Sequence, residues 1–96
     1  MSKGYILSAY REINDPEKLA AYGALAGPAV EAAGGRFLAR GGAVTAHEHG
    51  LEQRTVVIEF ESYEAALQLY ESEKYREALA VLGDAVIRDF RVVEGV

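Results

Sequence analysis

The apolar residues of this chain fall into short runs that repeat every two positions and longer runs at helical spacing. Residues 4–11 are rich in aromatic and branched side chains, which is typical of a β-strand. Ile6 and Leu7 are apolar neighbours, and neighbouring side chains of a strand point to opposite faces. We therefore expect the chain to begin with a strand that is buried on both sides.

A helix start follows this strand. Asp15 can accept hydrogen bonds from free backbone N–H groups, and Pro16 suits the first helical position. Apolar residues then continue at helical spacing as far as Ala33. Pro28 lacks an N–H and predicts a kink or a short second helical piece, and the Gly34-Gly35 pair predicts the helix end.

The middle of the chain predicts two more strands. In residues 36–40, Phe37 and Ala39 should face one side, and Arg36, Leu38 and Arg40 the other. The Gly41-Gly42 pair predicts a bend or bulge, after which residues 43–47 are expected to resume the strand. A polar loop then leads to residues 54–60, whose alternation of apolar side chains is the clearest strand pattern in the chain.

A second helical region and a last strand complete the pattern. Ser62 can cap the helix, and Ser72 can cap a new turn inside it, so we expect a break near Ser72. Gly83 predicts the helix end, and residues 85–93 predict the final strand. The resulting order is β-α-β followed by β-α-β, with the helices on one face of a four-stranded sheet.

The second face of this sheet requires a cover. Val56 and Val57, like Ile6 and Leu7, place apolar side chains on both faces of what should be central strands. A second copy of the chain, packed sheet against sheet, would bury the exposed face, so we predict a homodimer. The alternative is a monomer with a partly apolar open face, which antiparallel sheets tolerate.

Composition narrows the classes of partner. The chain has 96 residues, enough for one domain, and a formal net charge of -5, which disfavours nucleic acid and anionic membrane surfaces. It has no cysteine, which excludes disulfides and thiol chemistry. The first apolar run is too short for a membrane span or a signal peptide, so a cytoplasmic location is expected.

The sequence resembles an uncharacterised bacterial family of domains of unknown function, of about this length. The resemblance covers nearly the whole chain and is carried by Asp15-Pro16, Tyr22, Gly34-Gly35-Arg36-Phe37, Arg40-Gly41-Gly42, Arg54, Glu59-Phe60, Tyr70, Ser72, Tyr75 and Val93-Glu94-Gly95. It implies membership of the dimeric α/β-barrel superfamily, which includes monooxygenases, muconolactone isomerases and stress-response proteins. The implied fold class is α+β: a ferredoxin-like βαββαβ chain whose four-stranded antiparallel sheet pairs with that of a second copy. This chain departs from the family pattern at Leu82-Gly83, where an arginine is expected, and in the loop 48–53.

The candidate binding residues are Arg36, Arg40 and Glu59. Strand alternation predicts that all three point away from Phe37 and Phe60, into the space between the sheets of a dimer. Arginines there would hold a small anionic or carbonyl-bearing ligand, with Glu59 as a candidate catalytic proton acceptor. The alternative is an ion pair that has a structural role only.

Other residue patterns suggest weaker hypotheses. Tyr70 and Tyr75 flank the helix break and could line a pocket mouth, although packing is the more frequent role of a tyrosine. His47 and His49 lack further ligands, so no metal site is predicted, and no cofactor is expected. Asp84, Arg88 and Asp89 are interpreted as loop and strand-edge charges without a chemical role.

Two functions are compatible with this sequence. The first is a dimeric protein that binds or transforms a small organic molecule, in the cavity between sheet and helices or at the dimer interface. The second is a non-catalytic structural or stress-associated dimer, in which Arg36, Arg40 and Glu59 form an ion-pair network at the interface.

Overall fold

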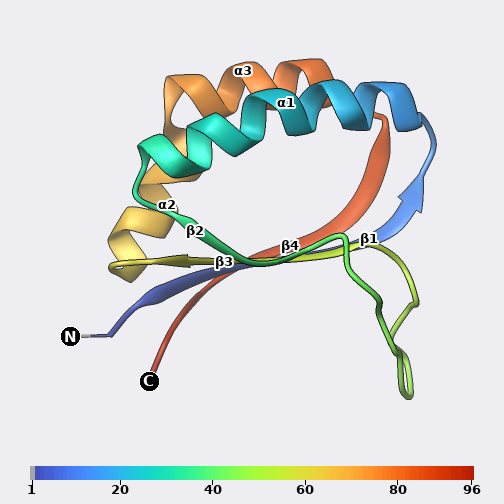
Figure 1. Cartoon of the computed structure of the whole chain (residues 1–96), viewed down its shortest axis with the longest axis horizontal. Helices are drawn as coiled ribbons and strands as arrows, with labels where there is room; N and C mark the ends of the chain where they lie inside the picture. Colours follow the sequence, from blue (N-terminus) through green and yellow to red (C-terminus); the bar gives the residue numbers. More distant parts are fainter. Residues whose placement is uncertain (1) are drawn as a thin grey trace.

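The strands and helices follow the predicted βαββαβ order in a computed structural model, which describes residues 2–96. The elements are β1 (Gly4–Ile13), α1 (Pro16–Ala32), β2 (Arg36–Arg40), β3 (Thr55–Phe60), α2 (Tyr63–Glu71), α3 (Glu73–Leu82) and β4 (Val86–Glu94). The sheet has the order β2-β3-β1-β4, and all its pairs are antiparallel. The helices lie on one face of this sheet (Figure 1). The predicted α+β ferredoxin-like fold is therefore confirmed.

Helix ends lie where the sequence places capping residues. The backbone N–H of Lys18 donates to Asp15 at 3.1 Å, and that of Ala65 donates to Ser62 at 3.1 Å. Ser72 ends α2 and caps α3 through the N–H of Tyr75 at 3.3 Å, so the predicted break near Ser72 is confirmed. Each cap satisfies a backbone donor that the first helical turn leaves free.

One of the two alternatives predicted for α1, a second helical piece at Pro28, is wrong. The helix continues through Pro28 as a single element, where the sequence predicted a kink or a second helical piece. The carbonyl of Ala24 loses its helical partner to the proline, but Ala24 is exposed and this carbonyl can bond to water. The cost of the lost hydrogen bond is therefore small at this position.

The chain after β2 also differs from its prediction. β2 ends at Arg40, and residues 41–54 contain no strand, whereas residues 43–47 were expected to resume it. The register of the β2–β3 pairing shifts within β2, between Phe37 and Ala39, and not at the following glycine pair. Gly41 has a φ of +76°, and the segment extends away from the helices, beyond the sheet (Figure 1).

The core lies between the sheet and the helices, and the other face of the sheet is open. Ile6 and Phe60 are fully buried against the helices. On the open face, Leu7 is 39% exposed, Val93 46% and Ile87 51%. In a single chain β1 is therefore buried on one side only, whereas the sequence predicted burial on both. No helix within residues 2–96 is long and apolar enough to cross a membrane.

Candidate functional site

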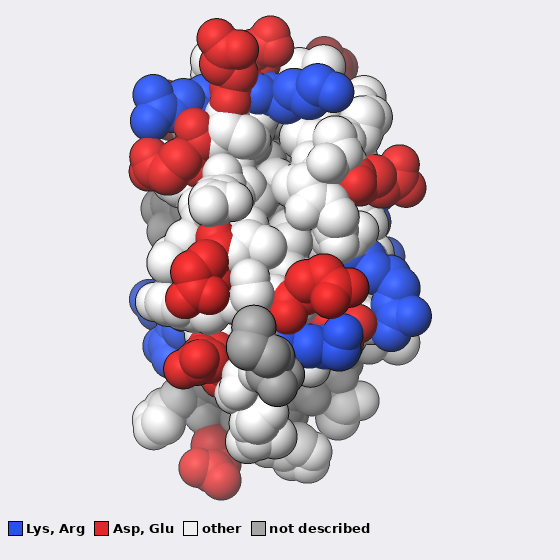
Figure 2. All heavy atoms as spheres, turned by 90° about the vertical axis from the view of Figure 1, so that its left-hand side faces the viewer, with Lys and Arg blue, Asp and Glu red and all other residues white. Residues whose placement is uncertain are grey.

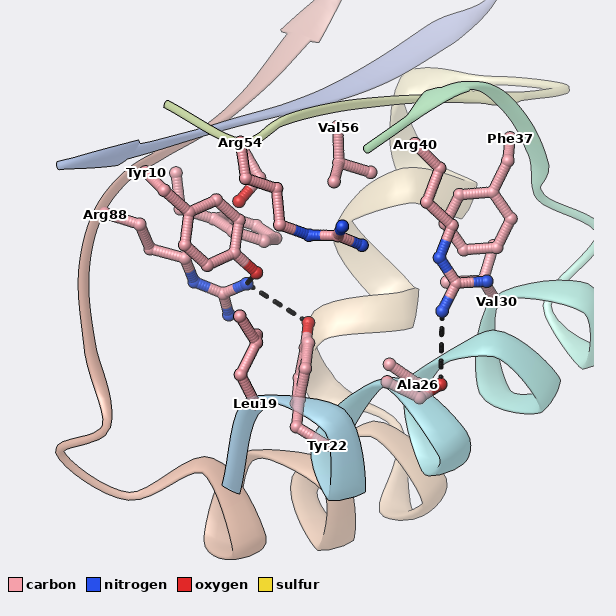
Figure 3. Close-up of a pocket in the computed structure, with 13 residues that line it drawn as sticks. Tyr10, Leu19, Tyr22, Ala26, Val30, Phe37, Arg40, Arg54, Val56 and Arg88 are labelled. Carbon is pink, nitrogen blue, oxygen red and sulfur yellow. Dashed lines mark hydrogen bonds between the residues drawn. The ribbon is translucent and has the colours of Figure 1, made fainter. Parts of the chain in front are cut away.

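A small pocket lies between the sheet and helix α1 (Figure 3). Its volume, counted as space for the centres of water molecules, is about 40 Å³, which is room for roughly three waters. All four strands and α1 contribute to its wall. The lining residues are Ser8, Tyr10, Leu19, Tyr22, Gly23, Ala26, Val30, Phe37, Arg40, Arg54, Val56, Arg88 and Phe90.

Arg88 joins three tyrosines at one end of the pocket. Its Nη1 donates to the hydroxyl oxygen of Tyr10 at 3.3 Å and to that of Tyr22 at 3.1 Å. Its Nη2 donates to the hydroxyl oxygen of Tyr75 at 3.3 Å, and the hydroxyls of Tyr22 and Tyr75 also bond to each other. The guanidinium lies 4.7 Å from the ring centroid of Phe90. A cation in this half-buried site is thus stabilised by phenol oxygens and aromatic faces, without a carboxylate.

These contacts determine where the hydroxyl protons lie. Burial, with the neighbouring Tyr22, raises the pKa of Tyr75 well above its ordinary value, although Arg88 opposes the shift. The Tyr75 phenol therefore stays protonated at neutral pH. Tyr10 accepts from Arg88, and its own proton has no acceptor among the described residues, so this hydroxyl can donate into the pocket.

Arg40 lies at the opposite end of the pocket and bridges β2 to α1 (Figure 3). Its Nη2 donates to the backbone carbonyl of Gly23 at 3.2 Å, and its guanidinium lies 4.3 Å from the ring centroid of Phe37. It packs over Gly23 and Gly27, where a Cβ would lie 3.6 and 3.4 Å from its nitrogens, which is ordinary van der Waals contact. The side chain thus lies against the surface of α1.

Arg54 precedes β3 and extends along the pocket towards Arg40 (Figure 3). Its Nε is buried and has no hydrogen-bond partner in the described part of the chain. Gly41 leaves space for this side chain, since a Cβ there would lie 2.6 Å from Arg54 Nη1. A guanidinium donor that is removed from water without a partner is unfavourable, and a bound acceptor would satisfy it.

The pocket is positively charged within an acidic protein. Three arginines line it, and the lining residues, all of them within the described range, include no Asp or Glu. Ser8 is only 3% exposed, and its Oγ has no hydrogen-bond partner among residues 2–96. The arrangement can hold an anion and donate hydrogen bonds to it. It offers neither a carboxylate nor a histidine as a general base.

The predicted binding residues divide between the two faces of the sheet. Arg36 and Glu59 meet on the open face, with 3.1 Å between Arg36 Nη2 and Glu59 Oε1, and the Tyr5 hydroxyl donates to Glu59 at 3.4 Å. Arg40 lies on the helix side, so the prediction that it shares a face with the other two is wrong. The irregularity after Phe37 adds one residue and reverses the alternation that follows it.

The two predicted tyrosines lie behind the pocket. Tyr75 is buried, bonds to Arg88 and does not line the pocket. Tyr70 is half exposed, with its ring centroid 5.6 Å from that of Tyr75 and 5.2 Å from that of Phe90. Both tyrosines support the aromatic wall, and neither lies at a pocket mouth.

Sequence reasoning missed Ser8, Tyr10, Tyr22 and Arg54 as site residues, and it assigned Arg88 no role. A signal was present in β1, where Ser8 and Tyr10 continue the buried face that Ile6 begins. Polar groups on a core-facing row require partners, and this is a reason to suspect a site there.

The described residues give little support for a metal site or a charged binding surface. Within residues 2–96 no group of three or more His, Cys, Asp or Glu could hold a metal ion. On the side of the molecule in Figure 2, acidic and basic side chains are interspersed and form no patch of one sign. The pocket is therefore the strongest candidate site among the described residues.

Comparisons with known proteins agree with this fold. A family model described as "Domain of unknown function (DUF1330)" matches residues 3–96. A protein of unknown function from Rhodopseudomonas palustris is 24% identical, with a TM-score of 0.69, over 97% of this chain and 80% of that chain. SnoaB, a cofactor-independent oxygenase from Streptomyces nogalater, is 9% identical, with a TM-score of 0.62, over 97% of this chain and 92% of that chain. A dimeric ferredoxin-like protein of unknown function from Thermobifida fusca YX is 16% identical, with a TM-score of 0.55, over 99% of this chain and 92% of that chain. A comparison with curated proteins found no match.

Proposed function

The chain belongs to the DUF1330 family, and we propose that it binds a small anionic organic molecule in the pocket between its sheet and helix α1. This family assignment confirms the resemblance found in the sequence. The family description assigns no activity, so the proposal depends on the geometry of the pocket.

One observation carries the proposal: Arg40, Arg54 and Arg88 line one small pocket whose described walls contain no carboxylate. Like charges in one partly buried site repel each other, and their desolvation is unfavourable unless an anion offsets it. The rest of the protein is acidic, with a net charge of -5. A local positive potential in a concave site attracts and holds anions.

The pocket favours an organic ligand over a bare inorganic ion. Val30, Phe37, Val56 and Phe90 supply an apolar wall that can contact a hydrocarbon group. SnoaB, which shares this fold, is a cofactor-independent oxygenase, so the fold can serve chemistry on a substrate without a cofactor. We propose binding and assign no reaction, because the lining residues supply no evident base.

Calorimetric titration of purified protein with acetate, propionate and pyruvate, at constant ionic strength, tests the proposal. Saturable binding is expected, and Arg54→Gln should weaken it at least about tenfold, because a charge-assisted hydrogen bond contributes roughly 1.5–3 kcal/mol. Arg76→Gln removes an exposed arginine that pairs with Glu71 on the outside of α3, and it serves as the matched control. Absence of saturable binding of any small carboxylate would refute the proposal.

A second role is favoured by the open face of the sheet. We propose that this face pairs with a second copy, with Arg36 and Glu59 as an ion pair at the interface. Its support is the 3.1 Å contact between the two side chains, the exposed Leu7 and Val93 on the same face of the sheet, and a dimeric protein of the same fold. Cytoplasmic location and the absence of nucleic-acid partners remain predictions from composition.

Equilibrium unfolding at several protein concentrations tests the dimer. The unfolding midpoint of an obligate dimer rises with concentration, and Arg36→Ala and Glu59→Gln should each lower it. A midpoint independent of concentration would show that the chain folds as a monomer. Unchanged midpoints in both variants would remove the interface role of the ion pair.

A further inference from the structure

The pocket has two chemically different ends, and their difference predicts which anions it accepts. The tyrosine end consists of Tyr10 and Arg88, the arginine end consists of Arg40 and Arg54, and Ser8 follows Tyr10 in the pocket wall. Figure 3 shows Tyr10 and Arg88 on one side, Arg40 on the other, and Arg54 extending between them. Resting on the proposed binding function, we infer that the ligand is a short 2-oxo or 2-hydroxy carboxylic acid.

The arginine end suits a carboxylate. Arg40 donates one hydrogen bond to a backbone carbonyl, and Arg54 Nε is buried without a partner among residues 2–96. Guanidinium groups with unused donors match the geometry of a carboxylate and bind it through two parallel hydrogen bonds. Arg40 is exposed and is held by one hydrogen bond to α1 and by its contact with the Phe37 ring, so it can turn towards a ligand that enters.

The tyrosine end suits a neutral oxygen and not a second carboxylate. Arg88 directs most of its N–H groups to the three phenol oxygens, so a ligand at this end meets hydroxyl groups and not the free guanidinium. The Tyr10 O–H is polarised by this cation and can donate to a ligand oxygen. A carbonyl or hydroxyl oxygen accepts such a bond without the desolvation that a second anionic charge requires.

Ser8 adds a polar group next to Tyr10 along β1. It lies two positions before Tyr10 on the same face of β1, and its register partners are Val56 and Phe90, which also line the pocket. Its buried Oγ has no partner in the described chain. A ligand oxygen that reaches Ser8 would accept a hydrogen bond from its hydroxyl, and it would satisfy a group that the fold leaves unpaired.

The pocket volume limits the ligand to a few carbon atoms. About 40 Å³ for the centres of water molecules holds roughly three waters, and bonded atoms lie closer together than waters do. A molecule of roughly five or six non-hydrogen atoms would fill this space. Pyruvate, glyoxylate and lactate have this size and carry both a carboxylate and a second oxygen.

The test compares acids of similar size by calorimetry. Pyruvate should bind at least about tenfold more tightly than propionate, which has the carboxylate but lacks the second oxygen. Inorganic phosphate should bind more weakly than pyruvate. Tyr10→Phe and Ser8→Ala should each bring the ratio of the pyruvate affinity to the propionate affinity closer to one. Arg54→Gln should weaken both acids, and Tyr63→Phe, a tyrosine outside the pocket lining, should change neither.

Each contrary result has a distinct meaning. If propionate binds as tightly as pyruvate, or if phosphate binds most tightly, the inference fails while the proposed function stands. If neither acid nor phosphate binds, the proposed function itself fails. Circular dichroism checks that each variant folds, and Ser8→Ala carries the same test if Tyr10→Phe does not fold.

Discussion

Replacement of Ser8 by alanine should stabilise the ligand-free protein. Ser8 is 3% exposed, and its Oγ has no hydrogen-bond partner within residues 2–96. A buried polar group without a partner costs about 1–3 kcal/mol. Water can enter the adjoining cavity and offset part of this cost, so we expect a gain at the lower end, about 1 kcal/mol. Most single substitutions destabilise a protein, and a gain at a buried position is therefore informative.

Urea unfolding followed by circular dichroism measures this gain. With a slope of about 1–3 kcal/mol per molar urea, a gain of 1 kcal/mol raises the midpoint by roughly 0.3–1 M. For a domain of this size it also raises the melting temperature by about 4–8 °C. Both shifts are well above the error of the measurement.

Ser62→Ala provides a control with the same chemical change and the opposite sign. The Ser62 hydroxyl accepts from the backbone N–H of Ala65 at 3.1 Å and caps α2. Loss of such a cap destabilises by about 1 kcal/mol. If Ser8→Ala also destabilises by this amount, the Ser8 hydroxyl has a hydrogen-bond partner in the ligand-free protein, and the reasoning about the unpaired group is refuted.

At saturating ligand the wild type should be more stable than Ser8→Ala, the reverse of the order expected without ligand. A ligand at about a hundred times its Kd stabilises by roughly 2.7 kcal/mol, and a tenfold weaker Kd reduces this by about 1.3 kcal/mol. The loss exceeds the expected gain of the variant, so pyruvate should stabilise the wild type above Ser8→Ala. An unchanged order in pyruvate would show that Ser8 does not contact the ligand.

Three further predictions concern the pocket wall, the open face and pH. Gly41→Ala should destabilise the protein by roughly 1–2 kcal/mol and weaken anion binding, because Gly41 has a φ of +76° and a Cβ would lie 2.6 Å from Arg54 Nη1. Urea unfolding measures the stability and calorimetry the binding, and wild-type values in both would contradict the prediction. Leu7→Lys should convert a dimer to a folded monomer in sedimentation velocity, since it places a charge on the open face, and an unaltered dimer would locate the interface elsewhere. Because the pKa of Tyr75 is raised in the folded protein, the Tyr75 phenol loses its proton at a lower pH in the unfolded chain than in the folded one. The free energy of unfolding should therefore fall as pH rises above about 10, and it should fall less steeply in Tyr75→Phe. An equal pH dependence of the two proteins would show that Tyr75 is not the cause.

Local sequence signals predicted most of the fold. The capping residues Asp15, Ser62 and Ser72 each begin a helix where the sequence places them. The apolar alternation in residues 54–60 identified β3 within one residue. These signals depend on neighbours in the sequence, and so they can be recognised without the tertiary structure.

The site could not be predicted to the same degree, because it depends on the tertiary structure. An irregularity in β2 moves Arg40 to the helix face, and no residue type in this stretch specifies its position. The sequence identifies Arg88 only as a charged residue of a strand. It becomes a site residue because the fold brings Tyr10, Tyr22 and Tyr75 next to it from three other elements.

The most direct test of the pocket is a titration of isotope-labelled protein with pyruvate, followed by backbone amide shifts in NMR spectra. The account predicts saturable shifts at residues of the pocket wall, Ser8, Arg54 and Arg88, with little change at Arg36 and Glu59 on the open face. Saturable shifts confined to Arg36 and Glu59 would place the site on the other face of the sheet. No shift at any residue would contradict the binding function.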